Sequence, residues 1–455
     1  MHLDTFERDE SDVRYYCRKV PNLLTSASGA IIRDDRGTLF IDFLSACGAL
    51  NYGHNHPKLK AAAIDYLSGD GIVAGLDFHT SAKLAFVKSF REVVLLPRGL
   101  NYKLQFPGPT GANCVEAAIK LARKVTGRTS VAAFTNAFHG MSAGALALTG
   151  SHQARCVSAP VLNGVVRIPF EGYRGAGLGD LDRFEAMAGD PSGGIDPIAA
   201  VVVETVQGEG GLNVASADWL RALSAMARRL GALFVIDDIQ AGCGRTGSFF
   251  SFEQAGVVPD LVCLAKSISG FGLPMSLLLL KPEHDVWEPG EHNGTFRGNS
   301  LAFATAKAAV DLWQHGDMGV LRGNTRILSR WTALMVEEFG DALRVKGRGM
   351  MQGLEFSTAE LAQAVAAASV ERGVIVECCG PYDEVLKIMP PLNIEPHTLE
   401  EGLDRVADAI RIVLSSYAGC QSKPTGCSEM YETRLDSFDD RSDAIVCPEL
   451  AHSVA

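Results

Sequence analysis

The sequence predicts an α/β protein whose large domain is built on a mostly parallel, seven-stranded β-sheet. Several of its short apolar runs are near-continuous in Val, Ile and Leu, as in strands covered on both faces. Helical patterns lie between the runs, and alternating strands and helices with short connections form parallel sheets. The runs occupy residues 103–106, 131–135, 165–169, 198–206, 233–239, 261–265 and 275–280.

Elements before and within this sheet carry local signals of their own. Residues 30–43, AIIRDDRGTLFIDF, predict a β-hairpin with the polar residues 34–37 as its turn. The stretch 113–125 repeats apolar residues at helical spacing, and 218–231 does the same before it ends at a glycine. We therefore expect both stretches to form helices between strands of the sheet.

The C-terminal part of the chain is organised differently. Over 312–417, helical patterns mix with short strands near 347–356 and 384–392, which predicts a smaller α+β domain. Beyond residue 417 the chain is polar, acidic and without periodicity, as flexible tails are. We expect four parts: an N-terminal segment of the small domain (1–50), the large domain (51–311), the C-terminal small domain (312–417) and a tail (418–455).

Composition excludes several classes of function. The formal net charge is −11, and an acidic surface repels nucleic acid, so no nucleic-acid partner is expected. There is no apolar run of about 18 residues, and the first twenty residues are charged throughout, so we expect no membrane span and no secretory signal. The 11 cysteines are odd in number and lack CxxC spacing, as expected for reduced thiols in a cytoplasmic protein.

Two charged residues stand at the ends of apolar strands. Lys266 follows the run 261–265 and precedes a glycine-rich turn, and Asp237 lies near the end of the run 233–239. Ligands of parallel sheets bind outside the carboxyl ends of strands, where a desolvated lysine is a usable nucleophile. A carboxylate buried there needs a cationic partner. Alternatively, the lysine is a surface residue and the aspartate a helix N-cap.

Two more segments carry signals for a ligand. PGPTGANCVEAAIKLAR is a glycine-containing loop that runs into a helix, where the amides of Gly111, Ala112 and Asn113 would bind a phosphate. In FTNAFHG, Phe138 and His139 follow a strand, where an aromatic ring either stacks on a flat cofactor or packs in the core. Together the four features predict a ligand with an aldehyde, a basic ring nitrogen, a phosphate and a planar face. Pyridoxal 5′-phosphate (PLP) has all four.

From about residue 11 to 417 the sequence resembles the class-III aminotransferases, PLP enzymes of fold type I. After the hairpin the motifs follow in colinear order: NYGHNHP, PGPTGANCVEAAIKLAR, FTNAFHG, VVETVQGEGG, FVIDDIQAGCGRTG, LAKSISGFGLP and GTFRGN. Within the family, the sequence looks most like the diaminobutyrate–2-oxoglutarate aminotransferases of the ectoine-pathway type. The motifs that carry this likeness are GDGIVAGLDFHT, VVETVQGEGGLNVA and IDDIQAGCGRTGSFFSFE.

The resemblance implies a role for each matching residue around the cofactor ring. Lys266 would bind PLP covalently and later move a proton. Asp237 would pair with the ring nitrogen, and Gln240 would approach the ring hydroxyl. Phe138, next to His139, would stack on the ring.

The phosphate contacts implied by the resemblance come from Gly111, Ala112 and Asn113. Thr295, in GTFRGN, would join them from a neighbouring subunit. The resemblance therefore implies a homodimer or larger homo-oligomer with shared active sites.

Substrate recognition is less determined by the resemblance. Relatives with ω-amine substrates use the position of Glu209, in QGEGG, as a gate that an arginine operates. Lys387 stands at the arginine's position, and lysine has the charge but no bidentate fork, unless it is only a solvated strand residue. Glu204 is expected in the wall of the cofactor site. Ala49 and Ala74 depart from the branch in segments that line the pocket in relatives, which leaves the substrate open.

The resemblance implies transfer of an amino group between glutamate and a short ω-aldehyde amino acid, first of all L-aspartate 4-semialdehyde, giving L-2,4-diaminobutyrate. An alternative is PLP-dependent elimination or replacement at the γ-carbon of a four-carbon amino acid such as a sulfonium substrate. A PLP-sensing regulator would need a DNA-binding domain, for which the N-terminal segment is too short and acidic. His54 and His56 lie in a predicted turn, so no metal site is expected.

Overall fold

The computed structural model describes residues 3–156, 162–316 and 318–421. At its centre lies a seven-stranded sheet in the order β4-β12-β11-β10-β7-β5-β6. Within this sheet β12 runs antiparallel to β11 and β4, and the remaining pairs are parallel. The strands are β4 (Lys103–Gln105), β5 (Ser130–Phe134), β6 (Val165–Ile168), β7 (Ile198–Val203), β10 (Leu233–Asp237), β11 (Leu261–Leu264) and β12 (Leu277–Leu280). The predicted sheet is confirmed, with one strand of this sheet in each predicted run, although the run 198–206 also reaches the first residue of β8 (Val206–Gln207), which belongs to another sheet.

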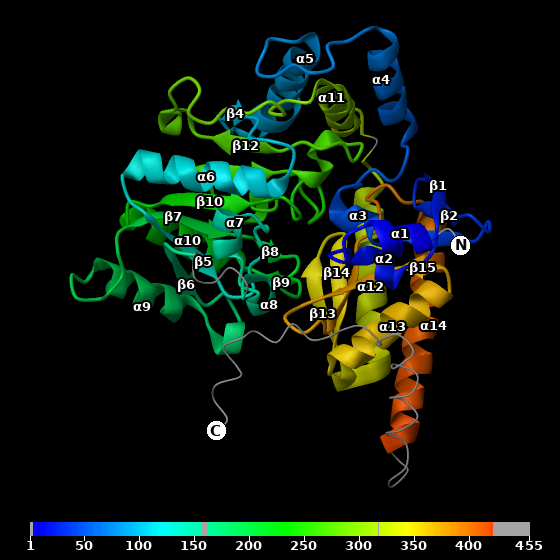
Figure 1. Ribbon diagram of the computed structural model, residues 1–455. Helices are drawn as coiled ribbons and strands as arrows, with labels where there is room; N and C mark the ends of the chain where they lie inside the picture. Colours follow the sequence, from blue (N-terminus) through cyan, green and yellow to red (C-terminus); the bar gives the residue numbers. More distant parts are fainter. Residues whose placement is uncertain (1–2, 157–161, 317, 422–455) are drawn as a thin grey trace.

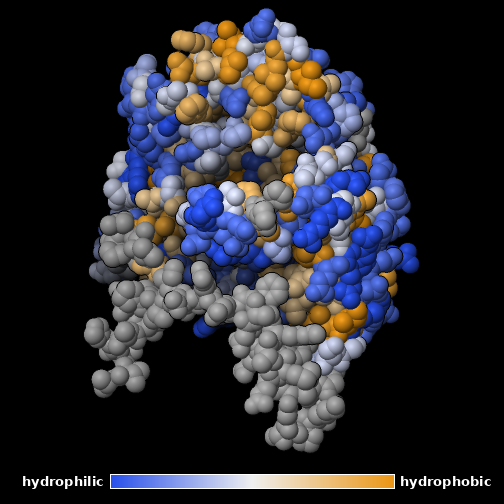
Figure 2. All heavy atoms as spheres, turned by 45° about the vertical axis from the view of Figure 1, so that its right-hand side comes forward, coloured by the Kyte–Doolittle hydropathy of each residue, from blue (hydrophilic) through white to orange (hydrophobic). Residues whose placement is uncertain are grey.

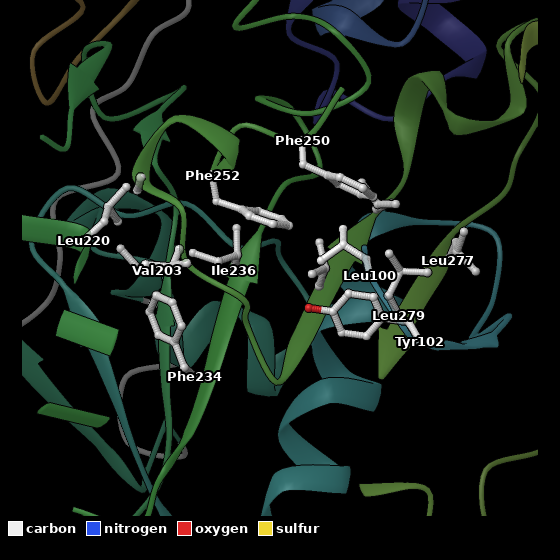
Figure 3. Close-up of a cluster of buried hydrophobic side chains, with 14 of the residues drawn as sticks. Leu100, Tyr102, Val203, Leu220, Phe234, Ile236, Phe250, Phe252, Leu277 and Leu279 are labelled. Carbon is white, nitrogen blue, oxygen red and sulfur yellow. The ribbon is translucent and has the colours of Figure 1, made fainter. Parts of the chain in front are cut away.

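Helices cover both faces of this sheet (Figure 1). Successive residues of β10 alternate between two apolar clusters, as side chains of a strand must. Val235 packs with α6 (Gly111–Thr126) in one cluster. Phe234 and Ile236 pack with α10 (Ala217–Arg229) in the other, part of which Figure 3 shows. The remaining helices of this part are α4 (Pro57–Ser68), α5 (Ser81–Ser89), α7 (Ala143–Leu148), α8 (His152–Arg155), α9 (Leu178–Gly189) and α11 (Ser300–Gln314).

Both ends of the chain contribute to a smaller α+β part, as the sequence predicts (Figure 1). Its first sheet has the order β1-β2-β3-β15, in which the C-terminal strand β15 pairs in parallel with β3 of the N-terminal segment. Its second sheet has the order β13-β14-β17-β16. The strands are β1 (Leu24–Ser28), β2 (Ile31–Asp34), β3 (Leu39–Asp42), β13 (Leu343–Arg348), β14 (Met351–Phe356), β15 (Val374–Ile375), β16 (Glu377–Cys379) and β17 (Val385–Ile388).

Helices pack on these two sheets and close the small part. They are α1 (Asp4–Asp9), α2 (Tyr16–Lys19), α3 (Ser45–Gly48), α12 (Leu321–Phe339), α13 (Ala359–Glu371) and α14 (Pro396–Gln421). The predicted hairpin is present as β2 and β3, with Ile31 paired to Ile41. Residues 418–421 of the expected tail continue α14, and residues 422–455 lie outside the described residues. The four-part division of the chain stays a prediction.

Candidate active site

The predicted site residues lie at one edge of the large sheet, where four parallel strands end. The loop with Phe138 and His139 follows β5, and Glu204 directly follows β7. Asp237 is the last residue of β10, and Lys266 comes two residues after β11. Such an edge is where open α/β sheets bind their ligands.

Asp237 is buried and ion-paired with a buried histidine. His139 Nδ1 donates to Asp237 Oδ2 over 2.6 Å, and the backbone N–H of Ile239 donates to Asp237 Oδ1 over 3.1 Å. Burial lowers the pKa of His139, but the hydrogen bond and the charge of Asp237 outweigh it, so this pKa is raised. The two hydrogen bonds therefore fix the orientation of the carboxylate at the strand end.

Glu204 is a second buried carboxyl group beside this pair. Its two oxygens accept the backbone N–H groups of Phe138 (3.0 Å) and Gly208 (3.2 Å). Burial raises the pKa of Glu204 to about 7, against the lowering effect of His139. The structure thus places Glu204 as a brace between the loop after β5 and the loop that carries Gly208.

The start of α6 lies against the ends of β5 and β10. A Cβ on Gly111 would lie 3.0 Å from Ile239 Cδ1, and one on Gly140 would lie 2.8 Å from Ala112 Cβ. The N-cap Thr110 accepts the N–H of Asn113 in a capping box. Of the three predicted phosphate-binding amides, that of Asn113 is therefore engaged, while Gly111 and Ala112 present N–H groups that have no partner within the helix.

Lys266 opens a short helical turn in an unusual backbone conformation. Its φ is +51°, a left-handed value that a residue with a side chain adopts only at some cost. Among the described residues, none accepts a hydrogen bond from its amine. Burial lowers the pKa of Lys266, and the charge of Glu209 opposes this effect. The result is a desolvated amine whose pKa lies below that of an ordinary lysine.

A polar network leads from this amine into the small part of the molecule. Gln240 Nε2 donates to the backbone oxygen of Cys47 over 3.0 Å and to Glu209 Oε1 over 3.1 Å. Lys387 Nζ donates to the same Glu209 oxygen over 2.9 Å. Lys387 is fully buried, so it is no solvated strand residue.

Sequence reasoning missed three residues of this network. Glu377 Oε1 lies 2.8 Å from Lys387 Nζ, opposite it in the β16–β17 register. Tyr16 Oη lies 2.9 Å from Cys47 Sγ, within hydrogen-bonding distance. A signal for Glu377 exists, because a charged residue in an apolar run, VIVECC, asks for a buried partner.

The remaining predicted residues lie at the rim. Thr295 and Ala74 are exposed, and Ala49 is half-buried. Ala74 forms an isolated antiparallel bridge with Asn299, which joins the two loops that carry Ala74 and Thr295. The contacts around Lys266 thus do not include Thr295 of the same chain.

The residues at the strand ends fit PLP. The amine of Lys266 has no described acceptor, and His139 Nδ1 holds the carboxylate of Asp237 in place over 2.6 Å. The second ring nitrogen of His139 is buried without a described partner. A Cβ on Gly111 would come within 3.0 Å of Ile239 Cδ1, and the N–H groups of Gly111 and Ala112 at the start of α6 are of the kind that binds phosphate.

Within the described ranges no group of three or more His, Cys, Asp or Glu side chains is arranged to hold a metal ion. No helix in that same part of the chain combines the length and the apolar composition needed to cross a bilayer.

Comparisons with known proteins agree with the geometry. A diaminobutyrate–2-oxoglutarate transaminase of Streptomyces anulatus is 51% identical over 413 residues, covering 90% of this chain and 98% of the relative. That of Streptomyces avermitilis is 49% identical over 414 residues, with the same coverage. The solved ornithine aminotransferase of Toxoplasma gondii shares the fold, with a TM-score of 0.80 at 24% identity over 91% of this chain and 94% of that chain. The family model "Aminotransferase class-III" matches residues 15–410. The chain belongs to the class-III aminotransferases, enzymes whose cofactor is PLP.

Proposed function

We propose that this enzyme transfers an amino group between glutamate and L-aspartate 4-semialdehyde, forming 2-oxoglutarate and L-2,4-diaminobutyrate. The observation that carries the proposal is the desolvated amine of Lys266, which has no acceptor among the described residues and follows the strand next to the one that ends at Asp237, where His139 holds the carboxylate. The substrates are inferred from relatives of about half identity that are named diaminobutyrate–2-oxoglutarate transaminases. The γ-elimination alternative finds no support in these relatives.

Each residue at the strand ends has a distinct task in this proposal. PLP, when bound, supplies a ring that withdraws electrons from the substrate carbon next to the amino group. Lys266 Nζ anchors the cofactor, takes the proton from that carbon and later returns a proton. Asp237 holds a positive charge on the ring nitrogen, and His139 fixes the orientation of the carboxylate through its Nδ1 hydrogen bond.

In this proposal several residues besides Asp237 and Lys266 bind the cofactor. Gly111 and Ala112 bind the phosphate through their N–H groups, Phe138 stacks on the ring, and Gln240 approaches the ring hydroxyl. Glu204 braces the loop that carries Phe138.

The Glu209–Lys387 pair would distinguish the two amino donors by charge. A diamine brings a positive charge to the pocket, which an ionised Glu209 attracts while it stays paired with Lys387. Glutamate brings a second carboxylate, which Lys387 can bind only when Glu209 leaves it. The charge of Glu209 interacts with those of both Lys387 and Lys266. Movement of Glu209 away from Lys387 therefore changes the electrostatic environment of the Lys266 amine.

We also propose a homodimer in which Thr295 completes the partner's phosphate site. The loops joined by the bridge between Ala74 and Asn299 expose large apolar side chains. Val73 is 75% and Phe296 is 77% exposed. Apolar side chains gather at the top of the molecule in Figure 2, over the end where Figure 1 shows α4 and α5. Contiguous apolar surface of this kind is covered in most stable proteins.

A cytoplasmic location follows from cysteine chemistry in this proposal. The eight cysteines of the described residues up to 417 are free thiols. Free thiols persist in reducing compartments. Cell fractionation with an antibody against the chain would test the location.

A coupled assay tests the reaction. Full-length protein with PLP, glutamate and L-aspartate 4-semialdehyde should release 2-oxoglutarate and L-2,4-diaminobutyrate in equal amounts. Lys266→Ala should bind PLP without the absorbance of the covalently held cofactor and should lose at least about 10³-fold in rate. A wild-type protein that transfers no amino group to any ω-aldehyde amino acid would overturn the proposal.

A further inference from the structure

Lys387 has two carboxylate partners where its charge requires one. Glu209 Oε1 lies 2.9 Å and Glu377 Oε1 2.8 Å from Lys387 Nζ. The side chain of Lys387 has no exposed surface. With all three groups ionised, the cluster carries a net charge of −1.

The two carboxylates are held differently. Glu377 belongs to β16, directly opposite Lys387 in β17, and its side chain is only 4% exposed. Glu209 lies on the glycine-rich loop between β8 (Val206–Gln207) and β9 (Asn213–Val214), and its side chain is 31% exposed. The sheet therefore fixes Glu377, whereas Glu209 has room to move.

A buried ammonium group strongly resists losing its only counter-ion. A lysine also has three rotatable N–H groups in place of the rigid fork of an arginine, so its direction must come from its partners. A fixed second carboxylate, that of Glu377, provides both effects. It keeps Lys387 charged and holds its orientation while the carboxylate of Glu209 is not bound to it.

Building on the proposed function, we propose that Glu377 is a positioning residue that serves as the permanent counter-ion of Lys387. Because Glu377 stays in place, Glu209 and a substrate carboxylate can bind Lys387 in turn. In this arrangement the ammonium group of Lys387 keeps its ion pair with Glu377. Another N–H group is shared in turn by Glu209 and by the second carboxylate of glutamate.

The charges of both glutamates act on Lys387, whereas burial raises the pKa of Glu377 and the charge of Lys387 lowers that of Glu209. Burial lowers the pKa of Lys387, but Glu209 and Glu377 raise it well above its usual value. The titratable groups that face Lys387 are Glu209, Glu377, Cys47, Cys378, Cys379 and, with like charge, Lys266. Removing the charge of Glu377 leaves Glu209 as the only carboxylate among them, so Lys387 loses its proton at a lower pH.

The first test measures binding of glutarate, a dicarboxylate that cannot react, to the PLP-loaded protein by calorimetry from pH 7.5 to 9.5. Glu377→Gln should lose affinity with rising pH, by up to about tenfold per pH unit, relative to wild type. Glu377→Asp, which keeps the charge, should restore the wild-type profile. The matched control is Glu355→Gln, a half-buried glutamate of β14 in the same sheet, which should follow wild type. A Glu377→Gln profile that coincides with that of Glu355→Gln would refute the role of Glu377.

The second test does not depend on the proposed function. In urea unfolding, Glu209→Gln and Glu377→Gln should each be tolerated, whereas the double variant should lose more stability than the sum of the two, because Lys387 then has no counter-ion. Additive losses would refute the inference. If no protein, wild type included, binds glutarate, the proposed function fails and this cycle alone decides the inference. If Glu377→Gln does not fold, adding Lys387→Met should restore folding, and a double variant that stays unfolded would refute it.

Discussion

Glu204 shows how its surroundings change the chemistry of a single residue. Because its pKa is about 7 in the folded protein and 4.5 in an ordinary environment, unfolding releases a proton between these values. Stability therefore falls as pH rises through this range.

Replacing Glu204 with glutamine should remove this pH dependence. Between pH 4.5 and 7, Glu204→Gln should gain up to about 3 kcal/mol in free energy of unfolding relative to wild type. Urea unfolding of both apoproteins across this range measures the difference. Glu337→Gln, at an exposed glutamate of α12, is the control, and parallel curves for Glu204→Gln and wild type would contradict the expectation.

The sequence reveals some site residues and hides others for a physical reason. Lys266 and Asp237 could be predicted, because a charged residue at the end of an apolar run is visible in the sequence itself. The Tyr16–Cys47 contact and the Glu377–Lys387 ion pair could not. They join positions far apart in sequence or on separate strands, and only the strand pairing of the small part brings them together.

At the scale of elements, the N-cap of α6 links helix stability to the cofactor site. Thr110→Ala should lower the free energy of unfolding by about 1 kcal/mol, because the N–H of Asn113 loses its acceptor. It should also weaken PLP binding, by up to about fivefold, because the first turn that presents Gly111 is no longer fixed. Urea unfolding and a PLP titration measure the two effects.

Ser216→Ala is the matched control for this prediction. Ser216 caps α10 by accepting the N–H of Trp219 over 3.2 Å. Loss of this cap should lower the free energy of unfolding by a similar amount and leave PLP binding unchanged. Equal losses of PLP affinity in both variants would mean that the cap of α6 has no special connection with the site.

The sequence predicts strands well where burial is complete and poorly where it is not. The run 198–206 was predicted as one strand, but β7 ends at Val203 and β8 begins at Val206. Between them Glu204 turns its carboxylate to two backbone N–H groups, which apolar periodicity does not reveal. β1 escaped prediction because its residues, LTSAS, are mostly exposed and polar.

At the scale of the whole molecule, Arg245 ties the large sheet to the small part. Its fully buried guanidinium donates to Asn51 Oδ1, to the backbone oxygen of Met350 over 3.1 Å and to that of Pro390. Asn51 directly follows the N-terminal segment, and Met350 and Pro390 lie in two loops of the small part. One side chain therefore holds together segments that are far apart in sequence.

Arg245→Lys should lower the free energy of unfolding by about 2–4 kcal/mol, because an ammonium cannot reach all three acceptors. Calorimetry should show the two parts of the molecule unfolding in separate transitions. Arg221→Lys is the control, since Arg221 is an exposed partner of Asp218. A single transition with an unchanged midpoint would contradict the role of Arg245.

The exposed apolar loops allow a test of the proposed homodimer. Val73→Asp should shift the protein from dimer to monomer in analytical ultracentrifugation and weaken PLP binding with it, because Thr295 of the second copy is lost. Val345→Asp, at an exposed position of β13, should leave both unchanged. A wild-type protein that sediments as a monomer would overturn the shared site.

The left-handed backbone at Lys266 implies that the presence of an amine at this position lowers the stability of the fold. A lysine there costs of order 1 kcal/mol in conformational strain, which the fold bears in order to aim one amine at its target. Glycine adopts the same φ without strain. Under the proposed function neither Lys266→Gly nor Lys266→Ala is active, and Lys266→Gly should unfold at a higher temperature than Lys266→Ala. Selection for thermal stability alone would therefore favour loss of the amine at this position.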